Sequence, residues 1–263
     1  MCIVSGPVER IANTRIVVAR LPGDRQLTVY ANTVDLKDGV PVAMILPYPE
    51  GEVEVLTTTK SDMSLFQFIE SFHADLGTFG GTLSRGAPAA QSAPLEVRRA
   101  GSYRYSIAET VTDLHRADPN IFALGGGALK GLLEEYIAKK FSFLVCRIDA
   151  DADYAPFAYV TPVVKDRLFV PTKHYHGEPE ESSHWDHTVY VLDNVKRGLV
   201  WSRGGLPAPE TFQSRERNPG CAFRCHLFRE FKSPAFPMLP ESYVYNYKIK
   251  AHGWMKNNDM FVV

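Results

Sequence analysis

The first residue in the chain whose type and position suggest chemistry is Cys2, which directly follows Met1. A small residue at this position favours removal of Met1, which would make Cys2 the N-terminal residue. Its α-amino group, with a pKa of about 8 in peptides, can then act as the base for its own thiol. This arrangement makes Cys2 a candidate catalytic residue of an N-terminal-nucleophile hydrolase. In the alternative interpretation, which we favour, Cys2 is a small buried apolar residue at the start of a strand.

A second candidate site is the segment 173–187, KHYHGEPEESSHWDH, which contains four histidines. His174 and His176 are two residues apart, so on a strand their side chains leave the same face. His184 and His187 follow after an acidic loop. Imidazole is a common ligand of zinc and other divalent ions, so the four histidines are a candidate metal site, although their spacing matches no standard zinc motif. Without such a metal, the sequence implies no cofactor.

The same segment also predicts a recognition surface, and we favour this interpretation over metal binding. Aromatic and imidazole side chains present an apolar body with a polar edge, which suits a surface that contacts a partner or ligand. The candidate binding residues are His174, Tyr175, His176, Trp185 and His187.

The motifs of well-known enzyme classes are missing from the chain. There is no Gly-x-Ser-x-Gly, no His-Glu-x-x-His, no P-loop ending and no kinase motif set. Whether the protein is an enzyme is therefore uncertain from sequence. The leading functional prediction is a non-enzymatic binding or structural module, acting on a protein partner or by self-association. A hydrolase that uses Cys2 and a metal protein that uses the histidines are the two alternatives.

Composition excludes several other classes of function. The 263 residues include 29 Lys and Arg against 30 Asp and Glu, so the net charge of -1 gives no field to attract nucleic acid. No apolar run reaches the roughly 20 residues that cross a bilayer, and the N-terminus lacks the pattern of a secretory signal. The four cysteines are too few for a secreted disulfide scaffold. We therefore expect a cytoplasmic protein that binds neither nucleic acid nor membrane.

Hydrophobic patterning predicts an α+β fold, with a mainly antiparallel sheet and two principal helices. Residues 15–21 and 26–34 flank a Pro-Gly-Asp turn and predict a hairpin. A strand over 41–46 is expected to end at Pro47 and Pro49. Helices are expected at Ser61–Leu76 and around 129–137, the second inside a strand, helix and strand unit at Gly101–Ile148.

A Gly, Pro, Ala and Ser rich segment divides the chain into two strand-plus-helix halves. We expect a strand-rich half with one helix at residues 1–80 and a flexible linker at 81–96. Residues 97–263 would form a second half, with the strand, helix and strand unit, further strands and a proline-rich tail. Whether the halves share one sheet is left open by the sequence.

The order of these features resembles a domain family of unknown function that is known mainly from bacteria. The resemblance extends over about residues 2–175 and rests on Cys2, the strand at 27–34, Pro47-Tyr48-Pro49, Gly101-Ser102-Tyr103, the helix at 132–139 and the strand at 141–145. Because that family has no assigned activity, the resemblance implies a fold and no catalytic residue.

Overall fold

The computed structural model describes residues 2–5, 8–71, 95–122, 124, 136, 140–149, 154–176, 182–194, 199–201, 231, 233–240, 245–256 and 259–262. Side chains are not described at residues 2, 174–176, 182–183, 199–201, 245–247 and 252–256.

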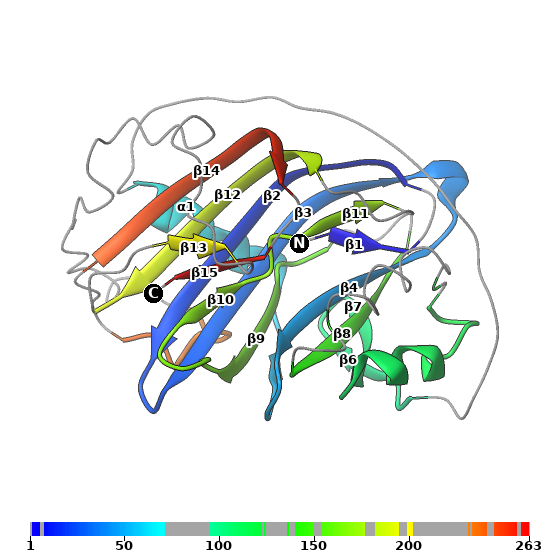
Figure 1. Ribbon diagram of the computed structural model, residues 1–263, viewed down its shortest axis with the longest axis horizontal. Helices are drawn as coiled ribbons and strands as arrows, with labels where there is room; N and C mark the ends of the chain where they lie inside the picture. The colour runs from blue at the N-terminus through cyan, green and yellow to red at the C-terminus, as the bar shows by residue number, and fades with distance from the viewer. Residues whose placement is uncertain are drawn as a thin grey trace.

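Sheet A has six strands in the spatial order β11-β1-β4-β8-β7-β6 (Figure 1). Its neighbours are antiparallel, except that β1 and β11 run parallel. The strands are β1 (Cys2–Val4), β4 (Val42–Pro49), β6 (Arg98–Ala100), β7 (Tyr103–Ala108), β8 (Phe141–Ile148) and β11 (His174–His176).

Sheet B also has six strands, in the order β14-β12-β2-β3-β9-β5, and here β12 and β2 are the parallel pair. Its strands are β2 (Val8–Leu21), β3 (Arg25–Leu36), β5 (Glu54–Leu56), β9 (Phe157–Pro162), β12 (Ser182–Asp193) and β14 (Tyr245–Lys256). A small sheet C consists of β10 (Leu168–Val170), β15 (Met260–Val262) and β13 (Leu199–Trp201).

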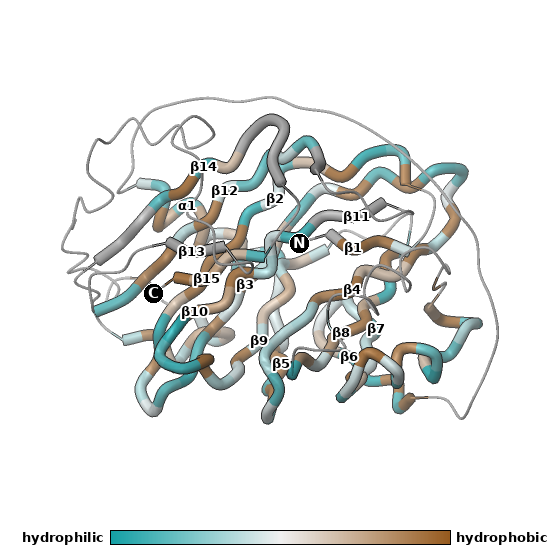
Figure 2. Tube along the Cα trace, viewed as in Figure 1, coloured by the Kyte–Doolittle hydropathy of each residue, from teal (hydrophilic) through white to brown (hydrophobic). Residues whose placement is uncertain are grey.

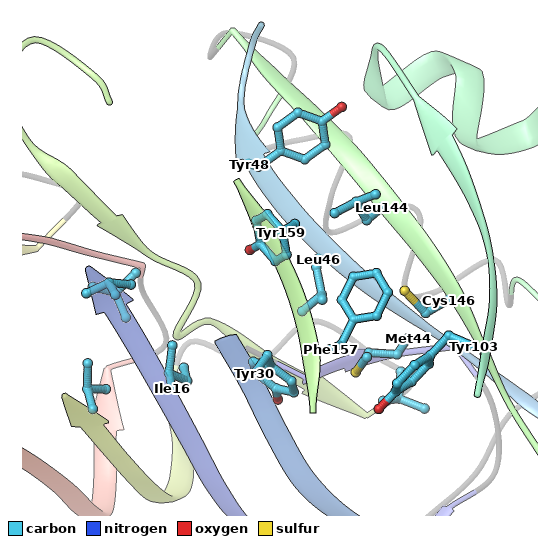
Figure 3. Close-up of a cluster of buried hydrophobic side chains, with 14 of the residues drawn as sticks. Ile16, Tyr30, Met44, Leu46, Tyr48, Tyr103, Leu144, Cys146, Phe157 and Tyr159 are labelled. Atoms are coloured by element: carbon cyan, nitrogen blue, oxygen red, sulfur yellow. The ribbon is translucent and has the colours of Figure 1, made fainter. Parts of the chain in front are cut away.

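The main hydrophobic core lies between sheets A and B. Val18 and Tyr30 from sheet B and Met44 and Leu144 from sheet A belong to one buried cluster. Figure 3 shows side chains of both sheets, among them Phe157, entering this cluster. The strands that contribute to it carry hydrophobic residues along much of their length (Figure 2). Burying one face of each sheet in this way is what holds a β-sandwich together.

Each sheet also buries apolar side chains on its other face. Phe66 and Ile69 of the helix α1 (Ser64–Glu70) pack with Val17 and Tyr190 of sheet B. Segments around 111–124 and Tyr136 cover the far side of sheet A. The molecule is therefore layered, with the two sheets inside and short helical segments outside.

The sequence prediction of an α+β fold with two principal helices is wrong, because strands make up 54% of the structure and helical residues 14%. In place of the helix predicted at Ser61–Leu76, a 3-10 turn, η2 (Lys60–Met63), precedes α1, which ends at Glu70. Further 3-10 turns are η1 (Lys37–Gly39) and η4 (Val111–Arg116). Two helical turns suffice to bury the apolar residues of α1. The spacing of apolar residues predicts a helix here but does not show where that helix ends. The helix predicted at 129–137 lies outside the described residues, apart from Tyr136.

The hairpin predicted at 15–21 and 26–34 is confirmed as β2 and β3, which pair from Leu21 opposite Arg25. The prediction that Pro47 and Pro49 end their strand is wrong, since β4 includes both. β1 pairs with β4 only at Met44 and Ile45. Around Pro47 and Pro49, β8 is the one described neighbour of β4. A residue without an N–H is therefore tolerated where its nitrogen faces the side of β4 away from β8.

Both large sheets contain strands from before and from after residues 81–96. In sheet A, β4 pairs with β8, and in sheet B, β3 pairs with β9. The two parts of the chain therefore share their sheets. The linker itself is outside the described residues, except 95 and 96, and the predicted division at this segment stays a prediction.

Candidate functional sites

Cys2 lies in β1, directly beside the strand that carries His174. The two strands are parallel, and Cys2 is in register with His174, as Ile3 is with Tyr175. Figure 1 shows β11 and β1 next to each other near the N-terminus. The fold thus brings together two candidate residues that are far apart in the sequence. Because their side chains are not described, this juxtaposition is one of backbone position.

A buried polar cluster adjoins this corner. Asp259 and Lys173 are 1% and 2% exposed. The Asp259 carboxylate accepts hydrogen bonds from the backbone N–H of Lys173, at 3.1 Å, and from the Tyr136 hydroxyl. The Nζ of Lys173 lies 5.9 Å from the centre of the Tyr136 ring. A buried carboxylate needs such donors. The bond from the backbone of Lys173 to Asp259 holds the residue that immediately precedes His174, so Asp259 fixes the start of β11.

The histidines predicted to act together do not all lie on one face. His184 and His187 are both in β12, but His184 is exposed and His187 is fully buried. Residues three apart on a strand leave opposite faces, which accounts for the difference. Trp185 is also fully buried, with its ring centre 4.8 Å from that of His187. These two candidate binding residues are therefore in the interior.

Metal binding and recognition by the histidine segment both stay predictions. Among the described side chains, no group of three or more His, Cys, Asp or Glu is arranged to hold a metal ion. The side chains of residues 174–176 are not among those described, so a site that includes His174 and His176 is not tested. The strands β11 and β12 do lie close together, which places the two parts of the segment near each other.

Asp186, another potential ligand in this segment, stabilises a bulge. Strand β2 shifts its register against β3 between Ala12 and Arg15, and Asn13 there has a φ of 55°. The Asp186 carboxylate accepts a hydrogen bond of 2.5 Å from the backbone N–H of Asn13. The extra residue of a bulge is left without a partner in its ladder, and Asp186 supplies one from the neighbouring strand.

Strand β14 forms one edge of sheet B in the described part of the chain (Figure 1). It is 12 residues long and pairs with β12 throughout, from Tyr245 opposite Asp193 to Lys256 opposite Ser182. An edge strand directs alternate main-chain N–H and C=O groups away from its neighbour. β14 therefore presents a long row of hydrogen-bonding groups in an extended conformation.

Three cationic side chains lie on the face of sheet B that also carries α1. Lys248 is opposite Tyr190, Lys250 is opposite Thr188, and Thr188 is in turn opposite Arg15. The Glu70 carboxylate, at the end of α1, accepts from the Tyr190 hydroxyl and forms an ion pair with Lys248. The Arg15 guanidinium lies 5.1 Å from the centre of the Phe66 ring. This set of Arg15, Lys248, Lys250 and Glu70 is called the basic cluster below.

Partial burial perturbs the groups of the basic cluster. Burial lowers the pKa of Lys250, the neighbouring Lys248 lowers it further, and Glu70 opposes both. Burial also lowers the pKa of Arg15, against the attraction of Tyr190 and Glu70. Within the described residues, the Nε of Arg15 is buried and has no hydrogen-bond partner. The charged forms of Arg15 and Lys250 are therefore disfavoured by their partial loss of hydration.

Compared by sequence, the chain matches no family model and no curated protein. Compared by structure, it is similar to baculovirus P35. The crystal structure of P35 has a TM-score of 0.48 and 10% identity, with 96% of each chain covered. The structure of the caspase-8/P35 complex has a TM-score of 0.48 and 13% identity, with 95% of each chain covered. The resemblance to a bacterial family of unknown function stays a prediction.

No helix in the described residues is both long and apolar enough to span a membrane.

Sequence reasoning missed the basic cluster and the juxtaposition of Cys2 with His174. The alternation of Lys248 and Lys250 with apolar Ile249 is a readable sign of a cationic strand face. In contrast, no local pattern places Glu70 beside Lys248, or His174 beside Cys2.

Proposed function

We propose that the protein is a non-enzymatic interaction module that binds a partner polypeptide along strand β14. The observation that carries this proposal is the 12-residue edge strand, which is paired along one side only in the described part of the chain. An extended segment of a partner that adds a strand to such an edge gains main-chain hydrogen bonds along its whole length. Because β14 is already extended, little ordering of this protein opposes binding.

A proline scan through residues 247–251 tests this function. On an edge strand, proline is tolerated where the N–H faces away from the sheet and destabilises where the N–H is bonded to β12. Tolerated and destabilising positions should therefore alternate in thermal denaturation. The folded proline variants then serve as probes, because each lacks one outward N–H together with the native side chain at that position.

A partner captured by the native protein should be lost from the folded proline variants and retained by a variant at a remote exposed position such as Lys140→Gln. Cross-links between the partner and the native protein should map to β14. Retention of the partner by every folded proline variant would contradict the proposal. So would a scan in which no position of β14 tolerates proline, since the edge would then be covered.

A hydrolase that uses Cys2 is the second candidate, and the register of Cys2 with His174 favours it. A thiol and an imidazole are the residue types of a nucleophile and its base. If this candidate is right, intact mass shows removal of Met1, and iodoacetamide alkylates Cys2 faster in the native protein than in His174→Gln. Retention of Met1, or equal alkylation rates in the two proteins, would remove this candidate.

A further inference from the structure

Three arginines form a row across one end of sheet A, where β6, β7 and β8 lie side by side (Figure 1). Arg99 of β6 is directly opposite Arg104 of β7. The guanidinium groups of Arg104 and of Arg147, in β8, both contact the carboxylate of Asp149. Tyr103, which precedes Arg104, enters the core between the two sheets. Because successive side chains of a strand leave opposite faces, the arginine row lies on the outer face of sheet A.

The arginine row lies at the margin of the layer that covers this face. The Arg147 guanidinium donates to the backbone carbonyls of Asn120 and Ile121, at 3.4 and 2.8 Å, and the Arg147 side chain is 17% exposed. The exposed fraction then rises along the row, to 37% for the Arg104 side chain, and Arg99 is exposed. A ligand can therefore reach Arg99 and Arg104 from solvent, while Arg147 is held by the protein.

The two outer arginines retain most of their hydrogen-bond donors. Asp149 is the one carboxylate among the described residues that forms an ion pair with the row, and it is shared by Arg147, at 2.6 Å, and Arg104, at 3.3 Å. The Arg99 side chain forms no hydrogen bond or ion pair in the part of the chain that the structure describes. A guanidinium carries five N–H donors. Like charges directly opposite each other on neighbouring strands are also destabilising, so the fold itself gains nothing from the placement of Arg99 beside Arg104.

We propose that Arg99 and Arg104 bind a phosphate group, either as the free anion or as a monoester carried by a partner molecule. Neighbouring strands are about 5 Å apart, so two guanidinium groups in register can contact one small anion from adjacent sides. Each guanidinium is a planar fork that fits two oxygens of a phosphate, and a phosphate monoester has three terminal oxygens that can accept from two forks. The site lies on sheet A, away from β14, and does not rest on the proposed function.

Asp149 fixes the geometry of this phosphate site and limits its affinity. Its backbone N–H donates to the Tyr154 hydroxyl at 2.5 Å, and its carboxylate orients Arg104. A side chain that is already held in place loses less conformational freedom on binding. The same carboxylate repels an anion placed beside it. We therefore expect weak and reversible binding, which the removal of the Asp149 charge should strengthen.

An NMR titration of the native protein, following the arginine Nε–Hε signals, tests this inference. The probes are inorganic phosphate and a short Gly-Ser peptide with one phosphoserine, and the control is the same peptide with serine. The phosphoserine peptide should bind at least about tenfold more tightly than the serine peptide at low salt, because its hydrogen bonds are charge-assisted. Similar affinities for phosphate and the phosphoserine peptide would identify the free anion as sufficient. A clearly tighter peptide would identify a monoester on a partner chain, and both results support the proposal.

Variants locate the phosphate on the protein. Arg99→Gln should weaken binding of the phosphoserine peptide by about tenfold, and Arg99→Lys, which keeps the charge but loses the fork, should be intermediate. Arg98→Gln is the matched control, because Arg98 is the adjacent exposed residue of β6, leaves the other face and pairs with Glu96 at 2.6 Å. It should leave binding unchanged. Asp149→Asn should bind about threefold more tightly, the effect of one partly exposed charge. Circular dichroism of each variant checks that it folds.

Four results would overturn the inference, and each leaves the proposed function of β14 standing. The first is an absence of any shift in the arginine signals with phosphate and the phosphoserine peptide in large excess. The second is equal binding of the phosphoserine and serine peptides. Equal losses in Arg98→Gln and Arg99→Gln would indicate a general basic surface in place of a site. Tighter binding of a single-stranded oligonucleotide with unphosphorylated ends than of the phosphoserine peptide would point to nucleic acid and against a phosphate monoester.

Discussion

The backbone N–H of Asn13 donates to the carboxylate of Asp186 at 2.5 Å, which ties the bulge in β2 to the adjacent strand β12. Asn13 sits at a φ of 55°, so this hydrogen bond holds a backbone conformation that L-residues rarely adopt. The bond also determines what Asp186 does, because a carboxylate that stabilises the sheet is less available as a ligand.

Replacing Asp186 by Ala should therefore destabilise the fold. We expect a loss of about 1 kcal/mol in the free energy of unfolding, since the bond is charge-assisted but lies near the surface. Urea denaturation measures the loss. Asp35→Ala is the matched control, because Asp35 is an exposed carboxylate on β3 and should cost little. Equal losses in the two variants would show that the bond to Asn13 contributes nothing.

Gly101 should be intolerant of any side chain. Its φ is +55°, and a Cβ built on it would lie 2.5 Å from the carbonyl oxygen of Thr58. Gly101→Ala combines an unfavourable backbone conformation with this clash, and we expect a loss of about 3 kcal/mol. Gly23→Ala isolates the first effect, because Gly23 has a φ of +75° in open space and should lose about 1 kcal/mol. Thermal or urea denaturation of both variants would show whether the clash adds to the cost.

The positions of the strands were more predictable from sequence than the pairing between them. The β2 and β3 hairpin could be predicted because a turn signal lies between two β-rich runs, so that pairing is local. The parallel pairing of β1 with β11, and of β12 with β2, joins distant segments and leaves no local pattern. The burial of Trp185 is likewise a tertiary effect, since it depends on Gly253 lying opposite and on Ala251 packing beside it.

The candidate sites show the same difference between what local sequence patterns predict and what contacts between distant segments decide. The chemistry of Cys2 and of the histidine segment can be read from residue types, but their juxtaposition needs the sheet order. The basic cluster likewise combines β2, β12, β14 and the end of α1. No spacing rule connects Glu70 to Lys248, because their contact depends on where α1 packs on sheet B.

Tyr48 should make stability depend on alkaline pH. Burial raises the pKa of this hydroxyl from about 10 to about 12, with a smaller opposing effect of a hydrogen bond with Ser142. Because the folded state holds the proton more tightly, this contribution is fully present below pH 10 and is lost as the pH rises through 12. Tyr48 should contribute up to about 3 kcal/mol to that loss. Urea denaturation from pH 8 to pH 12 should show a steeper decline in the native protein than in Tyr48→Phe, and parallel curves would contradict this.

Asp259 should be among the polar residues on which the fold depends. Its carboxylate accepts from both the Tyr136 hydroxyl and the Lys173 backbone while almost fully buried. Asp259→Ala removes the carboxylate that accepts from two buried donors, and we expect a loss of about 3 kcal/mol. Asp259→Asn keeps one acceptor oxygen and should lose less, and Tyr136→Phe, which removes one donor only, should lose about 1 kcal/mol. Denaturation in urea ranks the three variants, and a loss for Asp259→Ala no larger than that for Tyr136→Phe would show that the bond to Lys173 is dispensable.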